Sequence, residues 1–103
     1  MNDVRKPVHP GRVFFKYVLD PQGLTITDAA DMMGIARNAL SEFVNEKSSC
    51  SPQMVLKIAM ITRTNAETWL AMQAKLDLWE ARQQELARVS EASQNVQQPL
   101  FVD

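Results

Sequence analysis

The sequence predicts an all-α fold with five helices in one domain. Apolar residues recur at helical spacing along most of the chain. No stretch of sufficient length shows the alternation of apolar and polar residues that is typical of a β-strand. The 3 glycines and 5 prolines are few and fall at expected helix ends or in the terminal segments. A chain of 103 residues, 46% of them hydrophobic, can form one modest core but is too short for two.

The first helix is predicted to begin at Pro10, because proline fits the first turn of a helix. Residues 20–23, Asp-Pro-Gln-Gly, end it as a turn. Its apolar positions lie on one side, which is expected to be buried. These positions are Val13, Phe14, Tyr17 and Val18.

Two short helices are predicted next, over residues 28–33 and about 36–44, on either side of Gly34. Thr27 is expected to be the N-cap of the first of them, because its hydroxyl can accept a hydrogen bond from a free backbone N–H group. A fourth helix is expected from Pro52 to about residue 61, with Ser51 as its cap.

The last helix is expected to begin with a capping box between Thr64 and Glu67 and to continue to about Val89. The polar residues that follow are expected to fray. The chain is therefore divided into a flexible N-terminal arm over 1–8, a folded domain over 9–89 and a C-terminal tail over 90–103.

Residues 26–46 meet the requirements of a helix-turn-helix. Ala30 is small enough for close helix contact, and four residues later Gly34 tolerates a positive φ in the turn. The positions that should face the core are apolar, namely Met33, Ile35, Leu40 and Phe43. Any tight helical hairpin needs the same features. The outward face of the second helix is what distinguishes a DNA-binding helix-turn-helix from such a hairpin. That face holds short or hydrogen-bonding groups rather than a mixture of Glu and Lys.

This outward face predicts DNA binding. A helix of about ten residues is about 15 Å long, and its N-terminal half fits a major groove about 12 Å wide. Arg37 can bond a guanine edge or a phosphate, and Asn38 can pair with adenine. The predicted DNA-binding residues are Thr25, Thr27, Ala36, Arg37, Asn38, Ser41, Glu42, Asn45 and Lys47.

Their roles differ by chemistry. Ser41 suits a base edge, whereas Glu42 can only accept a hydrogen bond, from cytosine or from an internal partner. Thr25, Thr27, Asn45 and Lys47 are expected near phosphates, where they would fix the register of the protein on DNA. A solvated or capping role is the alternative for each residue, and Thr27 is the most ambiguous of them.

The last helix has two opposed apolar faces at 100° per residue. One holds Trp69, Met72, Leu76 and Trp79, and the other holds Ala71, Ala74, Leu78 and Ala81. Polar strips separate them, with Gln73, Asp77 and Glu80 on one flank and Lys75 and Arg82 on the other. The first face can close the core, and the second predicts a homodimer interface. The alternative is that the N-terminal arm or the segment 100–102 folds over it.

Charge is distributed unevenly along the chain. The net charge is −1, but residues 1–63 hold eight basic and six acidic groups, whereas residues 64–103 hold three basic and six acidic groups. The balances are +2 and −3. The basic residues 1–63 could thus contact phosphates, while the acidic residues 64–103 face a different partner.

Catalysis, cofactors and metal binding find no support in the sequence. His9 is the one histidine and Cys50 the one cysteine, too few for a metal site built from several such ligands or for a catalytic triad. His9 is expected at the entry to the first helix, and Cys50 as a small filler or a partly exposed thiol. No signal peptide or membrane span is evident, so a cytoplasmic protein with no membrane partner is expected.

The sequence also resembles the HigA-type antitoxins of toxin–antitoxin modules, a branch of the phage-repressor-like helix-turn-helix proteins. The matching motifs are His9-Pro10-Gly11, Gly34-Ile35-Ala36-Arg37-Asn38, the run 40–45, Ser51-Pro52-Gln53-Met54, Trp69-Leu70 and the run 76–82. The resemblance covers roughly residues 8–83. It implies a five-helix repressor-like bundle with a long C-terminal helix, a homodimer, autorepression and neutralisation of a small ribonuclease toxin.

Two positions depart from the family pattern. Members usually have Ser or Thr at the position of Ala36 and Gly at the position of Glu46. The expected function is a sequence-specific transcriptional repressor that binds operator DNA and acts as an antitoxin. Two alternatives remain, a stand-alone helix-turn-helix regulator without a toxin and a protein-interaction adaptor that has lost DNA binding. The net charge of −1 and the acid at Glu46 are the two observations that keep the adaptor as an alternative.

Overall fold

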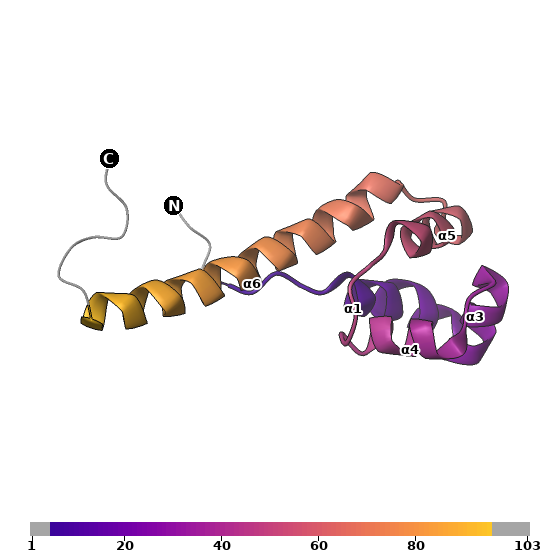
Figure 1. Cartoon of the computed structure of the whole chain (residues 1–103). Coiled ribbons are helices and arrows are strands. Elements are labelled where there is room, and N and C mark those ends of the chain that lie inside the picture. Colours follow the sequence, from indigo (N-terminus) through magenta and orange to yellow (C-terminus); the bar gives the residue numbers. More distant parts are fainter. Residues whose placement is uncertain (1–4, 96–103) are drawn as a thin grey trace.

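The computed structural model describes residues 5–95, and all regular structure in this range is helical (Figure 1). Three consecutive segments, α1 (Pro10–Phe14), a π-helical turn η1 (Phe15–Leu19) and α2 (Asp20–Gln22), form one continuous first helix. The other helices are α3 (Ile26–Met33), α4 (Arg37–Val44), α5 (Pro52–Thr62) and α6 (Ala66–Asn95). The five-helix all-α fold predicted from the sequence is confirmed.

The first helix begins with a tight contact. The Nδ1 atom of His9 accepts a hydrogen bond from the N–H group of Gly11 at 2.9 Å, so His9 is the N-cap. A Cβ atom on Gly11 would lie 2.0 Å from the carbonyl oxygen of Phe43, so only glycine lets α1 approach the end of α4 this closely. The expectation that His9 opens the first helix is confirmed.

The buried face of the first helix differs from the prediction after its first turn. Phe14 is fully buried as expected, but Tyr17 is 65% exposed and Leu19 is buried instead. Hydrogen bonds in a π-helical turn span five residues rather than four, so the helix holds an extra residue there and the buried face shifts along the sequence. The expected turn over 20–23 is also shorter, since Asp20 to Gln22 remain helical and only Gly23 leaves the helix.

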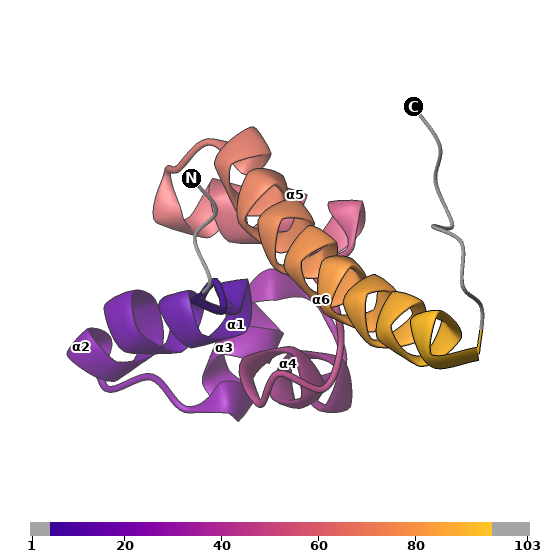
Figure 2. The same cartoon turned by 90° about the vertical axis from the view of Figure 1, so that its left-hand side faces the viewer.

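Aromatic rings join the first helix to α4 and α6 at the centre of the core. The ring of Phe14 lies 6.5 Å from that of Phe43 and 6.3 Å from that of Trp69, measured between centroids. Leu40, Val55 and Ile58 complete the fully buried set around them. In Figure 2, α6 crosses the layer that α1, α3 and α4 form.

The N-terminus of α6 is capped differently from the prediction. Asn65 Oδ1 accepts hydrogen bonds from the N–H groups of Glu67 and Thr68, at 2.8 and 3.3 Å. The predicted capping box between Thr64 and Glu67 is therefore wrong. The Thr64 hydroxyl accepts a hydrogen bond from Trp69 Nε1 at 2.7 Å and so orients the indole ring toward the core.

Gln73, predicted in a polar strip, is buried. Its Oε1 atom accepts a hydrogen bond from the N–H group of Cys50 at 2.7 Å, and its Nε2 atom donates to Asp77 at 2.9 Å. The Cys50 side chain fills space beside this bond, as expected for a filler, and burial raises the pKa of its thiol to about 11. Gln73 thus attaches α6 to the loop between α4 and α5.

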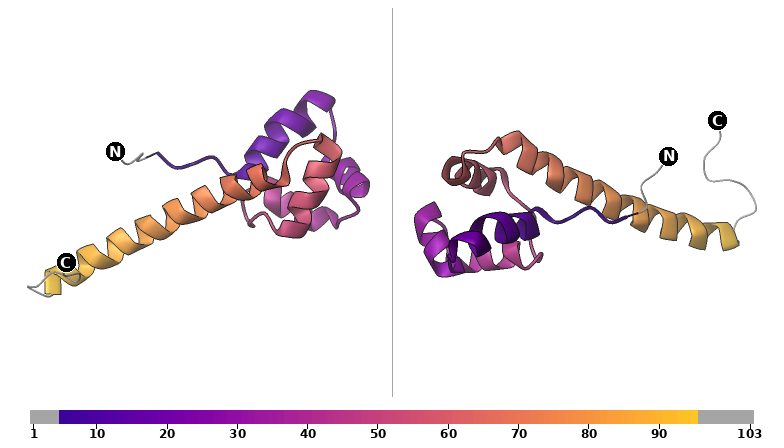
Figure 3. Two further views of the ribbon diagram at one scale, coloured as in Figure 1. Left: turned by 90° about the horizontal axis from the view of Figure 1, so that it is seen from above. Right: turned by 180° about the vertical axis from the view of Figure 1, so that it is seen from behind.

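The C-terminal half of α6 leaves the folded body and extends away from it (Figure 3). The helix reaches Asn95, six residues beyond the predicted end at Val89. The described part of the chain consequently measures 57 Å along its longest axis and 24 and 22 Å across. Within residues 5–95 no helix is both long and apolar enough to cross a membrane.

Candidate nucleic-acid interface

The turn between α3 and α4 has the geometry that the sequence predicts. Gly34 lies in the left-handed region with φ 69°, and its N–H group bonds the carbonyl oxygens of Ala30 and Asp31. The N–H group of Ile35 also bonds the carbonyl of Ala30 at 3.0 Å. Because Ala30 is buried and small, α4 can turn back and pack directly on α3.

The N-cap of α3 is Thr25, two residues before the predicted Thr27. Thr25 Oγ1 accepts a hydrogen bond from the N–H group of Asp28 at 3.0 Å, and the helix begins at Ile26. Thr27 therefore lies inside the helix, with its hydroxyl turned to the surface. There it accepts a hydrogen bond from Arg37 Nε at 3.0 Å.

The outward face of α4 carries the predicted base-contacting group. Ala36, Arg37, Asn38 and Glu42 are exposed, and Ser41 is half-buried. Ala36 is the N-cap residue but gives no side-chain hydrogen bond, so the first N–H groups of α4 receive no side-chain cap. The amide nitrogen of Asn45 donates to the Ser41 carbonyl at 2.8 Å, which turns part of Asn45 back onto its own helix.

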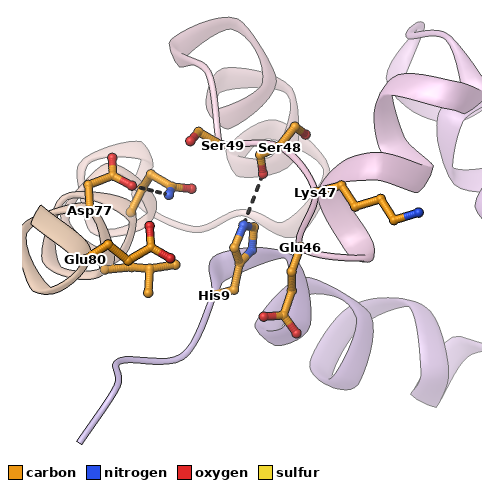
Figure 4. Close-up of a pocket in the computed structure, with 9 residues that line it drawn as sticks. His9, Glu46, Lys47, Ser48, Ser49, Asp77 and Glu80 are labelled. Carbon is orange, nitrogen blue, oxygen red and sulfur yellow. Dashed lines mark hydrogen bonds between the residues drawn. The ribbon is translucent and has the colours of Figure 1, made fainter. Parts of the chain in front are cut away.

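The loop after α4 explains the unusual Glu46. Its backbone has φ 64°, a left-handed conformation in which glycine is unstrained, so the glycine of the family pattern would fit this position better than Glu46 does. The Glu46 carboxylate lies 3.7 Å from Arg12 Nε, on the α1 side of the loop. Lys47 is exposed and points away from Asp77 and Glu80 of α6 (Figure 4).

His9 supports this loop from below. Its Nε2 atom donates a hydrogen bond to the Ser48 carbonyl at 3.1 Å (Figure 4), while Nδ1 is occupied as the cap of α1. A small polar hollow of about 240 Å³ opens beside the ring, lined in part by Asp77 and Glu80. The loop that carries Lys47 is thus held by contacts to both α1 and α6.

Some basic groups of the domain lie beside carboxylates, and others do not. Lys6, Arg12 and Arg88 lie beside carboxylates at 4.0 Å or less. By contrast, Arg37, Lys47 and Lys57 form no salt bridge with any other residue of the range 5–95. A cation without a nearby carboxylate can contact a phosphate without first losing a partner.

The nine predicted residues therefore occupy one continuous part of the molecule, along α3, α4 and the loop that follows. A short helix, a glycine turn and a second helix with a polar outward face define a helix-turn-helix protein of the DNA-binding class.

The face of α6 predicted to form a dimer is open. Ala71, Ala74 and Ala81 are exposed, and Leu78 is 50% exposed. A shallow, mainly apolar hollow of about 450 Å³ lies on this face, with Met72 along one edge. Of the N-terminal arm the structure describes residues 5–8, and these lie over another side of the helix, where Lys6 Nζ is 5.9 Å from the centre of the Trp79 ring. The segment 100–102, the other expected cover, lies outside the described residues.

Comparison with known proteins places the chain in a family. A helix-turn-helix family model matches residues 15–69. An uncharacterized HTH-type transcriptional regulator of Haemophilus influenzae is 36% identical over 93 residues, which cover 85% of this chain and 87% of that protein. Antitoxin HigA-1 of Vibrio cholerae is 34% identical over 98 residues, 95% of this chain and 88% of that protein.

A solved structure agrees with the fold. It is the Pseudomonas aeruginosa antitoxin HigA with the higBA promoter, which superposes with a TM-score of 0.73 at 20% identity and covers 92% of this chain and 99% of that one. The chain belongs to the helix-turn-helix family, in the branch of the HigA-type antitoxins. The resemblance stated from its motifs is confirmed.

Proposed function

We propose that this protein represses transcription from its own promoter by placing α4 in the major groove of an operator. The observation that carries the proposal is the outward face of α4, which is polar and lies beside basic groups that form no salt bridge within residues 5–95. Ala36, Arg37, Asn38, Ser41 and Glu42 would then face bases. Thr25, Asn45 and Lys47 would lie near phosphates and fix the register. The promoter that accompanies the Pseudomonas protein supports an operator as the ligand.

The functional unit is proposed to be a homodimer. The open apolar face formed by Ala71, Ala74, Leu78 and Ala81 supports this, because exposed apolar surface of this kind is typical of an interface. One recognition helix per protomer then requires a twofold operator with half-site centres about 34 Å apart.

The second part of the proposal is an antitoxin function. The support is the relationship to Antitoxin HigA-1, together with the charge balance of −3 over residues 64–103. An acidic surface suits a basic partner. The proposed partner is a small ribonuclease toxin encoded beside this protein, bound on preformed helices with little further ordering.

A gel-shift titration on the protein's own promoter tests the repressor function. Wild-type protein should retard the promoter in preference to a random duplex of equal length. The double variant Arg37→Ala with Asn38→Ala should retain only the non-specific component. Equal binding of both duplexes by wild-type protein would leave the adaptor as the better interpretation.

Co-expression with the neighbouring gene tests the antitoxin function separately. The neighbour should arrest growth when expressed alone, and this protein should restore growth and co-purify with it. A neighbour that is neither toxic nor retained would leave a stand-alone regulator, provided that the promoter is still bound.

A further inference from the structure

One hydrogen bond joins the two helices of the DNA-binding unit on their outer surface. Thr27 is the second residue of α3, and Arg37 is the first residue of α4. Arg37 Nε donates to Thr27 Oγ1 at 3.0 Å, and both side chains are exposed. Because Thr25 already caps α3, the Thr27 hydroxyl is not needed for that purpose. The bond therefore orients the one positive side chain at the tip of the recognition helix.

The choice of nitrogen limits what Arg37 can recognise. A guanidinium group has five N–H donors, one on Nε and two on each terminal nitrogen. Guanine offers two adjacent acceptors, N7 and O6, which an arginine can meet with both terminal nitrogens or with Nε and one terminal nitrogen. Since Thr27 occupies Nε, only the arrangement with both terminal nitrogens remains available.

The surroundings of Arg37 leave those terminal nitrogens available. Within the part of the chain that the structure describes, no carboxylate forms a salt bridge with Arg37. A long side chain that is already oriented loses less rotational freedom when it binds. A threonine hydroxyl that accepts one hydrogen bond can still donate its own proton, for example to a phosphate.

We propose that Thr27 is a positioning residue that holds Arg37 for end-on recognition of one guanine through both terminal nitrogens. This inference rests on the proposed binding of operator DNA. Thr27 thereby contributes to base preference without contacting a base. The sequence analysis expected Thr27 to contact a phosphate. In this proposal only its O–H group, which is still free to donate a hydrogen bond, can do so.

The test compares Thr27→Val with Thr27→Ser. Valine keeps the branched shape of threonine but cannot accept the hydrogen bond, whereas serine keeps the hydroxyl. Wild-type protein first selects its preferred sequence from a randomised duplex library. Arg37→Ala then identifies the base pair that Arg37 reads, as the position at which preference disappears. Affinities for the four duplexes that differ at that pair are measured for each variant.

We expect Thr27→Val to reduce discrimination at that base pair about three- to tenfold, the effect of losing the ordering of one long side chain. Discrimination at the other base pairs and the melting temperature should stay unchanged, and Thr27→Ser should behave within about twofold of wild type. In an Arg37→Ala background, Thr27→Val should have no further effect on base preference.

Two results would overturn the inference while leaving the proposed function intact. One is full discrimination by Thr27→Val at the Arg37 base pair. The other is an equal loss of affinity for all four duplexes, which would make Thr27 a phosphate contact only. If wild-type protein selects no sequence from the library, the proposed function itself fails, and the inference fails with it.

Discussion

The two halves of α6 share one continuous backbone but have different environments. In the first half, Trp69, Gln73 and Leu76 are buried against the rest of the domain. In the second half every residue from Glu80 to Glu91 is exposed except the half-buried Val89. The first half is thus stabilised by tertiary packing. The second half depends on its strong helix formers and on local pairs such as Glu85 with Arg88.

The contrast between the halves identifies the part of α6 that would need a partner. A helix of about 15 residues with no tertiary contacts is only marginally stable in water. The projecting half of α6 is therefore the part whose helical state should respond most to dimerisation or to a bound toxin. The packed half and the α3–α4 unit should keep their structure without either partner.

The largest effect is expected from Trp69→Ala in the packed half. Removing a buried aromatic ring from the core should lower the free energy of unfolding by about 3–5 kcal/mol. Leu86→Ala in the projecting half is the matched control, since Leu86 is 63% exposed and little packing is lost. Thermal and urea unfolding measure both. Equal losses would mean that the two halves do not differ as described.

Leu78→Glu addresses the boundary between the halves. A charge on the open apolar face should convert the proposed dimer to a folded monomer, because a carboxylate cannot be buried there unpaired. Light scattering gives the mass, and hydrogen exchange should show faster exchange in residues 80–95 than in α3 and α4. A folded dimer after this substitution would mean that the face is covered within one chain.

Substitutions on α4 and in the loop that follows it test whether DNA recognition belongs to the packed region alone. Arg37→Ala and Asn38→Ala should each lose about 1–3 kcal/mol of binding, mainly to the preferred sequence. Lys47→Ala should weaken binding to all sequences and reduce the salt slope by about one unit. Binding titrations at several salt concentrations measure both. A change of base preference by Lys47→Ala but not by Asn38→Ala would contradict this placement of α4.

Cys50 gives the packed region a pH dependence in the alkaline range. Burial raises the pKa of its thiol to about 11, from 9.0 for an exposed thiol. The folded state therefore keeps the proton longer than the unfolded state, and this contribution to stability falls as the pH rises from about 9 to about 11. Urea unfolding across this range should show a steeper decline for wild type than for Cys50→Ala. Equal declines in the stability of wild type and Cys50→Ala would contradict a role of the buried thiol.

The smallest effect is expected from Arg88→Ala. Its hydrogen bonds to Glu85 lower the pKa of that carboxyl, but both side chains are exposed. Water and salt screen such a pair, so the melting temperature should not change measurably. Circular dichroism can detect a small loss of helix in the projecting half. A clear fall in melting temperature would show that this half contributes more to the fold than its exposure suggests.

The order of the helices and most of the core could be predicted from the sequence, because helical spacing and the glycine turn are local signals. Phe14, Leu40 and Phe43 are buried as expected. The caps were harder, since Thr25 and Thr27, like Thr64 and Asn65, are close together and chemically similar. Which residue caps depends on where the chain turns into the helix, and tertiary packing decides that.

Helical periodicity gave the wrong burial for Tyr17, and polarity gave the wrong burial for Gln73. The π-helical turn changes the spacing on which the assignment of Tyr17 relied. Gln73 lies one helical turn from both Trp69 and Leu76, so its position on the buried stripe was available from spacing. Its polarity argued against burial, and only the distant loop at Cys50 explains it. The hydrogen bond between Thr27 and Arg37 likewise depends on the angle between two helices, which the sequence does not state.

The bond between Gln73 and Cys50 also has a mechanical consequence. From Gln73 to Asn95 the helix continues for 22 residues, a length of about 33 Å at 1.5 Å per residue. A tilt of about 10° at the bonded end would displace the far end by about 6 Å over this length. A small rotation of α6 at the Gln73 amide is therefore amplified into a large displacement of its C-terminal end.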